Sequence, residues 1–171
     1  SPVNTKIKPF KALQYLFKKG SYNVERFYSE NFASLLKKSP EKHQFDVVIF
    51  DNVFSARYLE IFKKIGIPTF VRTHNVEFEV WRTQAEATAN PLKKWYLKKL
   101  SNDLKQFEID ILNEVDGIMS ISTDDSLKFA EEGVKTRTTT IPVSIAIPMY
   151  KHDYSNKGIF HLGAMNWQPN V

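Results

Sequence analysis

Four polar residues, Arg72 to Asn75, follow directly on the apolar segment Thr69 to Val71. The β-branched and aromatic side chains of that segment predict a buried strand, which places the polar residues at its carboxyl end. Ligands of open parallel sheets bind in the crevice at this end of the strands. We therefore predict that His74 is a catalytic residue, with Asn75 and Arg72 as substrate-binding neighbours.

These residues can instead have purely structural roles, and the sequence does not decide between the two possibilities. A histidine beside a strand end is often a structural residue whose ring is held by its neighbours. Side chains alternate along a strand, so Arg72 can point to the face opposite the crevice. The acids that follow, Glu77 and Glu79, are expected to cap the next helix, because negative charge is favourable at a helix N-terminus.

A second group of hydroxyls ends the predicted strand at residues 116–121. Ser120 and Ser122 can donate hydrogen bonds into the same crevice, which makes them candidate substrate-binding residues. The alternative is a strand-to-helix cap, for which serine is a preferred residue.

The composition excludes several kinds of site. The 171 residues contain no cysteine, which excludes disulfides and cysteine-ligated zinc and fits a reducing compartment such as the cytosol. His43, His152 and His161 have no histidine or carboxylate partner at metal-ligand spacing. We therefore predict no metal, no cofactor and a cytoplasmic location.

The net charge of +5 comes mostly from lysines. No basic-aromatic recognition motif accompanies them, so no nucleic acid is expected as a partner. No apolar run reaches the roughly 20 residues of a membrane-spanning helix, and the N-terminus lacks the apolar core of a secretory signal. Basic helices, the first at residues 7–19, can dock on the rest of the domain or contact an anionic membrane surface peripherally.

Strands and helices alternate along the chain, which is typical of a layered α/β fold. Strands are predicted at residues 45–51, 69–71, 116–121, 138–142 and 158–163, and helices at residues 7–19, 24–38, 54–65, 76–82, 91–114 and 126–132. The continuous apolar run of the first strand indicates a parallel strand covered on both faces. We therefore expect a Rossmann-like, open, mostly parallel sheet with helices on both faces.

Local signals predict the ends and the buried sides of the helices. Asn90 is expected to cap the long helix, with Pro91 at its first position. Asn23 is expected to cap the second helix, which Ser39 and Pro40 should end. Spacings of three and four predict the residues that face the core, namely Phe10, Leu13, Leu16, Phe17, Phe27, Tyr28, Phe32, Leu35, Tyr58, Ile61, Phe62, Ile65, Tyr96, Leu100, Leu104, Phe107, Ile111 and Val115.

Several segments, taken in order, resemble the N-terminal half of retaining glycosyltransferases with the GT-B fold, of the large family often called family 4. They are Phe45 to Asp51, Arg72 to Glu77 with Trp81, the long helix with Phe107 and Glu108, Ile118 to Asp125, Ile141 to Val143, and Leu162 to Asn170. In one branch of that family, a glycine followed by Trp-x-Pro-Asn opens the C-terminal domain. The resemblance covers most of the chain from about residue 45.

The resemblance implies two Rossmann-like domains that face a cleft, the N-terminal one for the acceptor and the C-terminal one for the nucleotide-sugar donor. Residues 1–157 would form the later part of the acceptor domain. Residues 158–171 would begin the donor domain, where Gly163 would let the backbone approach a phosphate. The residues that hold the donor would lie beyond this sequence, so the fragment by itself is expected to be inactive.

The resemblance also implies the reaction, which is transfer of a sugar, with retention of configuration, to a hydroxyl of a sugar or lipid-linked acceptor. Such a transfer passes through an oxocarbenium-like transition state, so the site must orient the acceptor hydroxyl and stabilise the departing phosphate. An imidazole at the cleft edge, here that of His74, can bond the hydroxyl or the reacting centre.

Two alternative functions stay open. One is a nucleotide-sugar epimerase or hydrolase that shares the GT-B fold. The other is a phosphoacceptor receiver domain used in signalling, because Asp51 and Thr73 end successive strands. A receiver also needs an acidic pair after its first strand and a lysine at a later strand end, neither of which is seen in this sequence.

Overall fold

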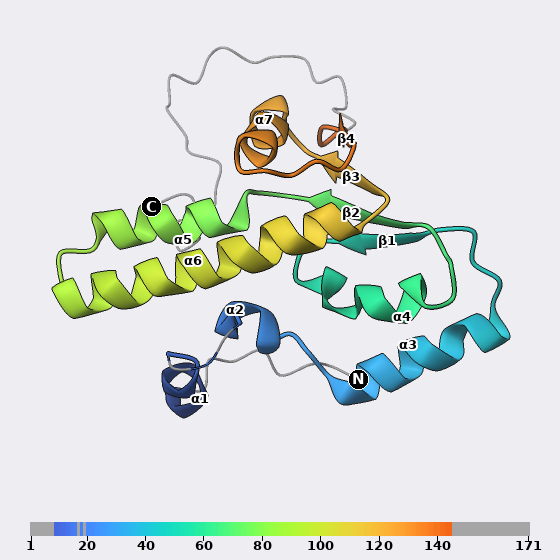
Figure 1. Cartoon of the computed structure of the whole chain (residues 1–171), viewed down its shortest axis with the longest axis horizontal. Helices are drawn as coiled ribbons and strands as arrows, with labels where there is room; N and C mark the ends of the chain where they lie inside the picture. Colours follow the sequence, from blue (N-terminus) through green and yellow to red (C-terminus); the bar gives the residue numbers. More distant parts are fainter. Residues whose placement is uncertain (1–8, 17, 19, 145–171) are drawn as a thin grey trace, which may run out of the picture.

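The computed structural model describes residues 9–16, 18 and 20–144, which contain a four-stranded parallel sheet and its connecting helices (Figure 1). The strands are β1 (Val48–Asp51), β2 (Thr69–Thr73), β3 (Gly117–Ser120) and β4 (Thr138–Thr140). They lie side by side in chain order, and each neighbouring pair is parallel. The predicted Rossmann-like α/β fold is confirmed.

Helices precede the first strand and connect the successive strands. They are α1 (Pro9–Gln14), α2 (Tyr22–Glu25), α3 (Glu30–Lys42), the 3-10 helix η1 (Ser55–Tyr58), α4 (Leu59–Lys63), α5 (Glu77–Ala87), α6 (Pro91–Glu114) and α7 (Thr123–Glu131). Among these described helices, none is both long and apolar enough to span a bilayer. The predicted strand at 158–163 lies outside the described residues.

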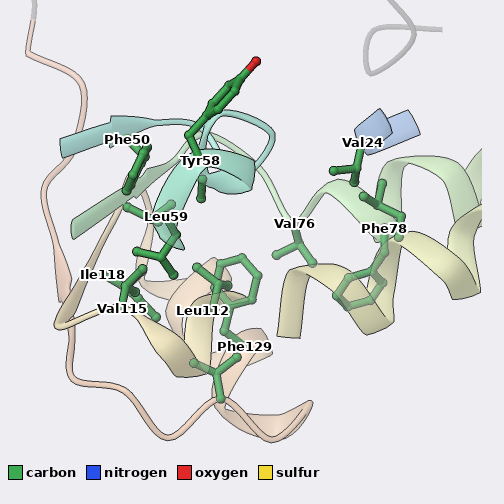
Figure 2. Close-up of a cluster of buried hydrophobic side chains, with 14 of the residues drawn as sticks. Val24, Phe50, Tyr58, Leu59, Val76, Phe78, Leu112, Val115, Ile118 and Phe129 are labelled. Atoms are coloured by element: carbon green, nitrogen blue, oxygen red, sulfur yellow. The ribbon is translucent and has the colours of Figure 1, made fainter. Parts of the chain in front are cut away.

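The hydrophobic core lies against one face of the sheet (Figure 2). Phe50, Val71 and Ile118 come from three neighbouring strands, are buried, and belong to one cluster with Leu112 of α6. On the other face, Ile49 of β1 is 55% exposed. Since nearly all parallel crossovers are right-handed, adding strands in one direction places the connecting helices on one side. Within the described residues, the helices that connect the strands therefore cover the core face of the sheet. The sequence had predicted helices on both faces.

Helices α5 and α6 form an antiparallel hairpin (Figure 1). The predicted start of α6 is confirmed, because Asn90 Oδ1 accepts a hydrogen bond from the N–H of Lys93 at 3.0 Å and Pro91 is the first helical residue. The buried side of α6 includes Leu97, Leu100, Leu104 and Leu112. Helix α5 extends to Ala87, which is longer than the predicted turn at residues 76–82.

The predicted helix at residues 24–38 is wrong in its bounds, because the structure has the two helices α2 and α3 in this region. Asn23 is buried within α2, and the side chain of Ser29 caps α3. Pro40 lies inside α3 although it has no N–H to bond to the carbonyl of Leu36. The hydroxyl of Ser39 donates to that carbonyl at 2.8 Å. A side-chain donor thus replaces the missing backbone bond and lets the helix continue.

Several residues predicted to face the core are exposed instead. They are Phe10, Phe32, Leu35 and Ile65. The small residues Ala12 and Ala33 are buried in α1 and α3 in their place. The side chains of Leu13 and Phe17 lie outside the described residues. Hydrophobic spacing predicted these helices but not the side on which they pack. A helix can approach its neighbour closely where it carries a small residue, and that side is the one that is buried here.

Replacing Gly117 by alanine is expected to lower the free energy of unfolding by about 1–2 kcal/mol, because it overpacks the sheet. A Cβ at this position would lie 2.6 Å from Cε1 of Phe70 on the adjacent strand, so the ring would have to move. Urea unfolding followed by circular dichroism measures the change. In a Phe70→Ala background the same substitution should cost much less, and an equal cost in both backgrounds would show that the ring is not the cause.

Candidate functional site

A histidine–aspartate pair lies at the carboxyl ends of β1 and β2. His74 follows the last residue of β2, and its Nε2 is 2.7 Å from Oδ1 of Asp51, the last residue of β1. The two strands are parallel neighbours, so their carboxyl ends meet at one edge of the sheet. The side chain of His74 is 42% exposed and that of Asp51 is 74% exposed. The imidazole is therefore open to solvent at the strand ends rather than packed in a layer.

Asp51 holds the ring of His74 in a defined orientation. An ionised carboxylate can only accept a hydrogen bond, so Nε2 of the imidazole carries the hydrogen of this contact. In the neutral ring, Nδ1 then keeps a lone pair that can accept a hydrogen bond from a hydroxyl. If the ring takes up a proton, the same carboxylate stabilises its charge. The arrangement can thus orient a hydroxyl or stabilise developing positive charge on the imidazole.

Arg72 lies on the same face of the sheet as Asp51. The strand register pairs these two residues directly, and paired residues of parallel strands point to the same side. This face is the one opposite the core, where Ile49 and Phe70 also lie. The sequence alone did not tell to which face Arg72 points. The strand pairing places it beside Asp51, whose carboxylate bonds His74. A guanidinium at this corner can bind phosphate or carboxylate oxygens in a bidentate manner.

Asn75 lines a cavity of about 740 Å³ between α5 and α7. The other walls come mainly from α5 and from the first turns of α7. The amide of Asn75 also bonds to the side chain of Glu77. Burial raises the pKa of Glu77, while the bond from Asn75 and the nearby His74 act in the opposite direction. His74 and Asn75 are thus consecutive in sequence but have different surroundings.

Glu108 of α6 bonds the N-terminus of α5, a contact that the sequence patterns did not predict. Its carboxylate accepts hydrogen bonds from the N–H groups of Glu77 at 3.2 Å and of Phe78 at 3.1 Å. Glu77 and Glu79 do lie in the first turn of α5, but the helix N–H groups are bonded by this third acid. Burial raises the pKa of Glu108 to about 8, although the two N–H groups act to lower it. The sequence feature that could have predicted this contact is the presence of an acidic residue, Glu108, on the buried side of α6.

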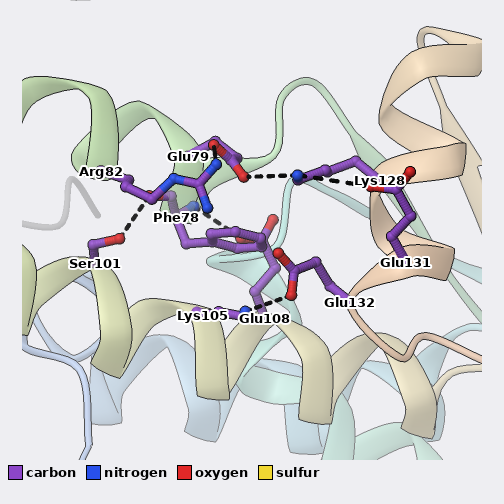
Figure 3. Close-up of polar contacts among 9 residues, drawn as sticks. All are labelled: Phe78, Glu79, Arg82, Ser101, Lys105, Glu108, Lys128, Glu131 and Glu132. Carbon is purple, nitrogen blue, oxygen red and sulfur yellow. Dashed lines mark hydrogen bonds and ion pairs between the residues drawn. The ribbon is translucent and has the colours of Figure 1, made fainter. Parts of the chain in front are cut away.

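Charged residues connect α5, α6 and α7 beside this buried acid (Figure 3). Glu79 of α5 pairs with Arg82 on its own helix, and its Oε1 is 3.5 Å from Nζ of Lys128 of α7. Lys105 of α6 pairs with Glu132 just after α7. The pair of Glu79 and Lys128 joins the two helices that form the walls of the cavity next to Asn75.

Ser120 and Ser122 are both used in the junction between β3 and α7. The hydroxyl of Ser120, which is fully buried, donates to the carbonyl of Ser122 at 2.8 Å and lies 2.5 Å from the hydroxyl of Ser126. Ser122 caps α7 by accepting from the N–H of Asp125 at 3.0 Å. These hydrogen bonds all lie within the junction itself. Such local bonds are expected if the two serines serve to cap the helix, which was the alternative to substrate binding.

Two of the sequence expectations concern sites elsewhere in the chain. Gly163 lies outside the described residues. Within residues 9–16, 18 and 20–144, no group of three histidine or carboxylate side chains is arranged to hold a metal ion.

Comparisons of this chain with protein-family models, with curated proteins and with solved structures found no match. The molecule is therefore characterised by its own geometry. That geometry is a Rossmann-like α/β fold in which a histidine held by an aspartate opens to solvent at the carboxyl edge of the parallel sheet.

Proposed function

We propose that the chain is the acceptor-side part of a retaining glycosyltransferase of the GT-B type. The observation that supports this most directly is the solvent-open imidazole of His74, held 2.7 Å from Asp51 at the carboxyl edge of the sheet. The order of segments from Phe45 to Asn170 that resembles family 4 enzymes adds to it. Fold alone does not select a function, so the proposal depends on this site.

His74 would position the reacting hydroxyl of the acceptor. The free ring nitrogen can accept the hydrogen of that hydroxyl, and Asp51 would keep the ring from turning away. Arg72, paired with Asp51 in the strand register, would be close enough to help balance the negative charge of the departing nucleotide diphosphate. Asn75, in the wall of the cavity between α5 and α7, would bond to other hydroxyls of the acceptor.

By the same resemblance, the donor-binding residues would belong to a second domain, of which residues 158–171 would form the beginning. The 171 residues alone should therefore bind an acceptor without turning over a donor. Activity should therefore be measured on a protein that carries both of the proposed domains.

A panel of nucleotide sugars and hydroxyl acceptors tests the proposed reaction. The expected result is a glycoside product with the anomeric configuration of the donor, detected by NMR. An epimerised donor, or free sugar whatever acceptor is added, would instead support the alternative epimerase or hydrolase. Phosphorylation of Asp51 by a small phosphodonor, without any transfer, would support a receiver domain.

A further inference from the structure

Apolar and basic side chains form an exposed patch at the start of α6, which we call the α6-start patch. It consists of Leu92, Lys93, Lys94, Trp95 and Lys98, of which Lys94 is half-buried and the others are exposed. Leu92 is 78% exposed and Trp95 is 57% exposed. Residues three apart are neighbours on a helix surface, so these two large apolar side chains lie next to each other. The patch combines exposed hydrophobic surface with positive charge.

The core of the protein does not explain these two apolar residues. The buried side of α6 in this region is formed by Leu97 and Leu100. Trp95 is two positions before Leu97, which corresponds to about 200° around the helix. Its side chain therefore leaves the helix on the side away from the core.

The lysines of the patch are available for an external partner. In the part of the chain that the structure describes, Lys93, Lys94 and Lys98 form no ion pair, and Lys94 reaches only the carbonyl of Glu86 at 3.5 Å. By contrast, the next lysine, Lys99, is paired with Asp103 at 2.6 Å. Three positive charges without an ion pair thus lie in the same first two turns of α6 as Leu92 and Trp95. Lys98 is next to Trp95 on the helix surface, whereas Lys93 is about 200° from it.

The hairpin holds the patch at a projecting end of the molecule. Helix α5 starts beyond the carboxyl end of β2 and runs away from the sheet, and α6 returns toward β3 (Figure 1). Helix α6 has 24 residues, a length of roughly 36 Å at 1.5 Å per residue. The Asn90 cap and Pro91 fix the first turn of this helix. The patch is therefore presented on a rigid element, on the side of the sheet where the strands end.

We propose that the α6-start patch docks on a lipid bilayer that contains anionic lipids. Tryptophan favours the boundary between head groups and acyl chains, and an adjacent leucine adds apolar surface that can enter it. Lysines around them are attracted to anionic head groups, while their alkyl stems lie along the apolar region. The charge of the patch is complementary to this surface. This inference is independent of the proposed sugar transfer.

The chemistry of the patch favours a bilayer over a second copy of the chain. In a two-fold symmetric dimer the same surface meets itself. The three unpaired lysines of one copy would then face those of the other, and like charges repel. For residues 7–19, where the sequence suggested a peripheral contact, Ala12 of α1 packs on the hairpin, so any such contact would use the other side of that helix, where Phe10 is exposed.

Vesicle binding tests the proposal with the purified 171-residue chain. Binding is measured by co-sedimentation with vesicles of phosphatidylcholine mixed with phosphatidylglycerol, and with phosphatidylcholine alone. The wild type is expected to bind the anionic vesicles, and less at high salt. Replacing Lys93, Lys94 and Lys98 together by glutamine should weaken binding on the order of 100-fold, since each lysine contributes roughly fivefold. The double change Leu92→Ser and Trp95→Ser should weaken it as well.

A matched set of variants on α3 provides the control. Leu35 of α3 is 59% exposed, and Lys37, Lys38 and Lys42 of the same helix are also exposed. Leu35→Ser and the triple change of these lysines to glutamine should leave vesicle binding close to wild type. Equal losses from the α3 and α6 variants would overturn the proposal in favour of general charge attraction. A dimer seen by sedimentation velocity and abolished by Leu92→Ser with Trp95→Ser, without vesicle binding, would overturn it in favour of self-association.

Discussion

His74→Ala is expected to lower kcat/KM for sugar transfer by about 100-fold or more in the protein that carries both domains, the usual size of the loss of a positioned proton acceptor or donor. The ring lies at the strand ends with Nε2 bonded to Asp51, and alanine removes the group that would orient the acceptor hydroxyl. Initial rates over a range of acceptor concentrations measure the effect. The loss should fall mainly on kcat, because the contact strengthens in the transition state.

Two further variants make this prediction specific. Asp51→Asn should lower activity less than His74→Ala, and the double variant should be little worse than His74→Ala alone, because Asp51 acts through the ring. His43→Ala, which removes an exposed histidine just after α3, is the matched control and should retain full activity. The pair between Asp51 and His74 is solvent-exposed, so its loss should change stability by less than about 1 kcal/mol. Full activity of the His74→Ala enzyme would remove the site assignment.

Glu108→Ala is expected to lower the free energy of unfolding by about 2–3 kcal/mol, because it leaves buried polar groups without partners. The carboxylate is fully buried and accepts from the N–H groups of Glu77 and Phe78 at the start of α5. No side chain at the N-cap position, Val76, replaces it. Denaturant unfolding of the two proteins measures the difference. Glu41→Ala, at an exposed position of α3, is the control and should change stability little.

The destabilisation by Glu108→Ala should also depend on pH. The pKa of Glu108 is raised from 4.5 to about 8 in the folded protein, chiefly by burial, with Glu77 and Asp125 adding in the same direction. The folded state therefore binds its proton more tightly than the unfolded chain does. The stability that this proton binding contributes is fully present below about pH 4.5 and is lost as the pH rises through about 8. The substitution should cost more at about pH 5 than at about pH 8.5, and a cost that does not vary with pH would contradict the assignment.

Local patterns were sufficient for much of the fold. Runs of apolar and β-branched residues predicted all four described strands, and the order of strands and helices predicted the parallel sheet. The cap at Asn90 and the helix start at Pro91 were also predicted, because capping depends on a few neighbouring residues. The position of His74 at a strand end followed from the same local reasoning.

Packing decided what these patterns could not. Residues Asp51 and His74 are separated by 23 positions, and their contact depends on how β1 and β2 pair across the helices between them. The local pattern of either strand alone does not give this pairing. Glu108 bonds the start of a helix 30 positions away. The docking sides of α1 and α3 depend on the surfaces that they meet, so Ala12 and Ala33 are buried while Phe10 and Leu35 are exposed.

The sequence by itself thus determined the strands, the order of the helices and the polar residues at the strand ends, because propensity, capping and periodicity act over a few residues. The tertiary structure alone decided that Asp51 holds His74, that Arg72 shares their face, that a buried acid bonds the start of α5, and which apolar residues of α6 stay outside. Such contacts arise only when segments far apart in the chain are brought into register, where geometry and burial determine each side chain's partner.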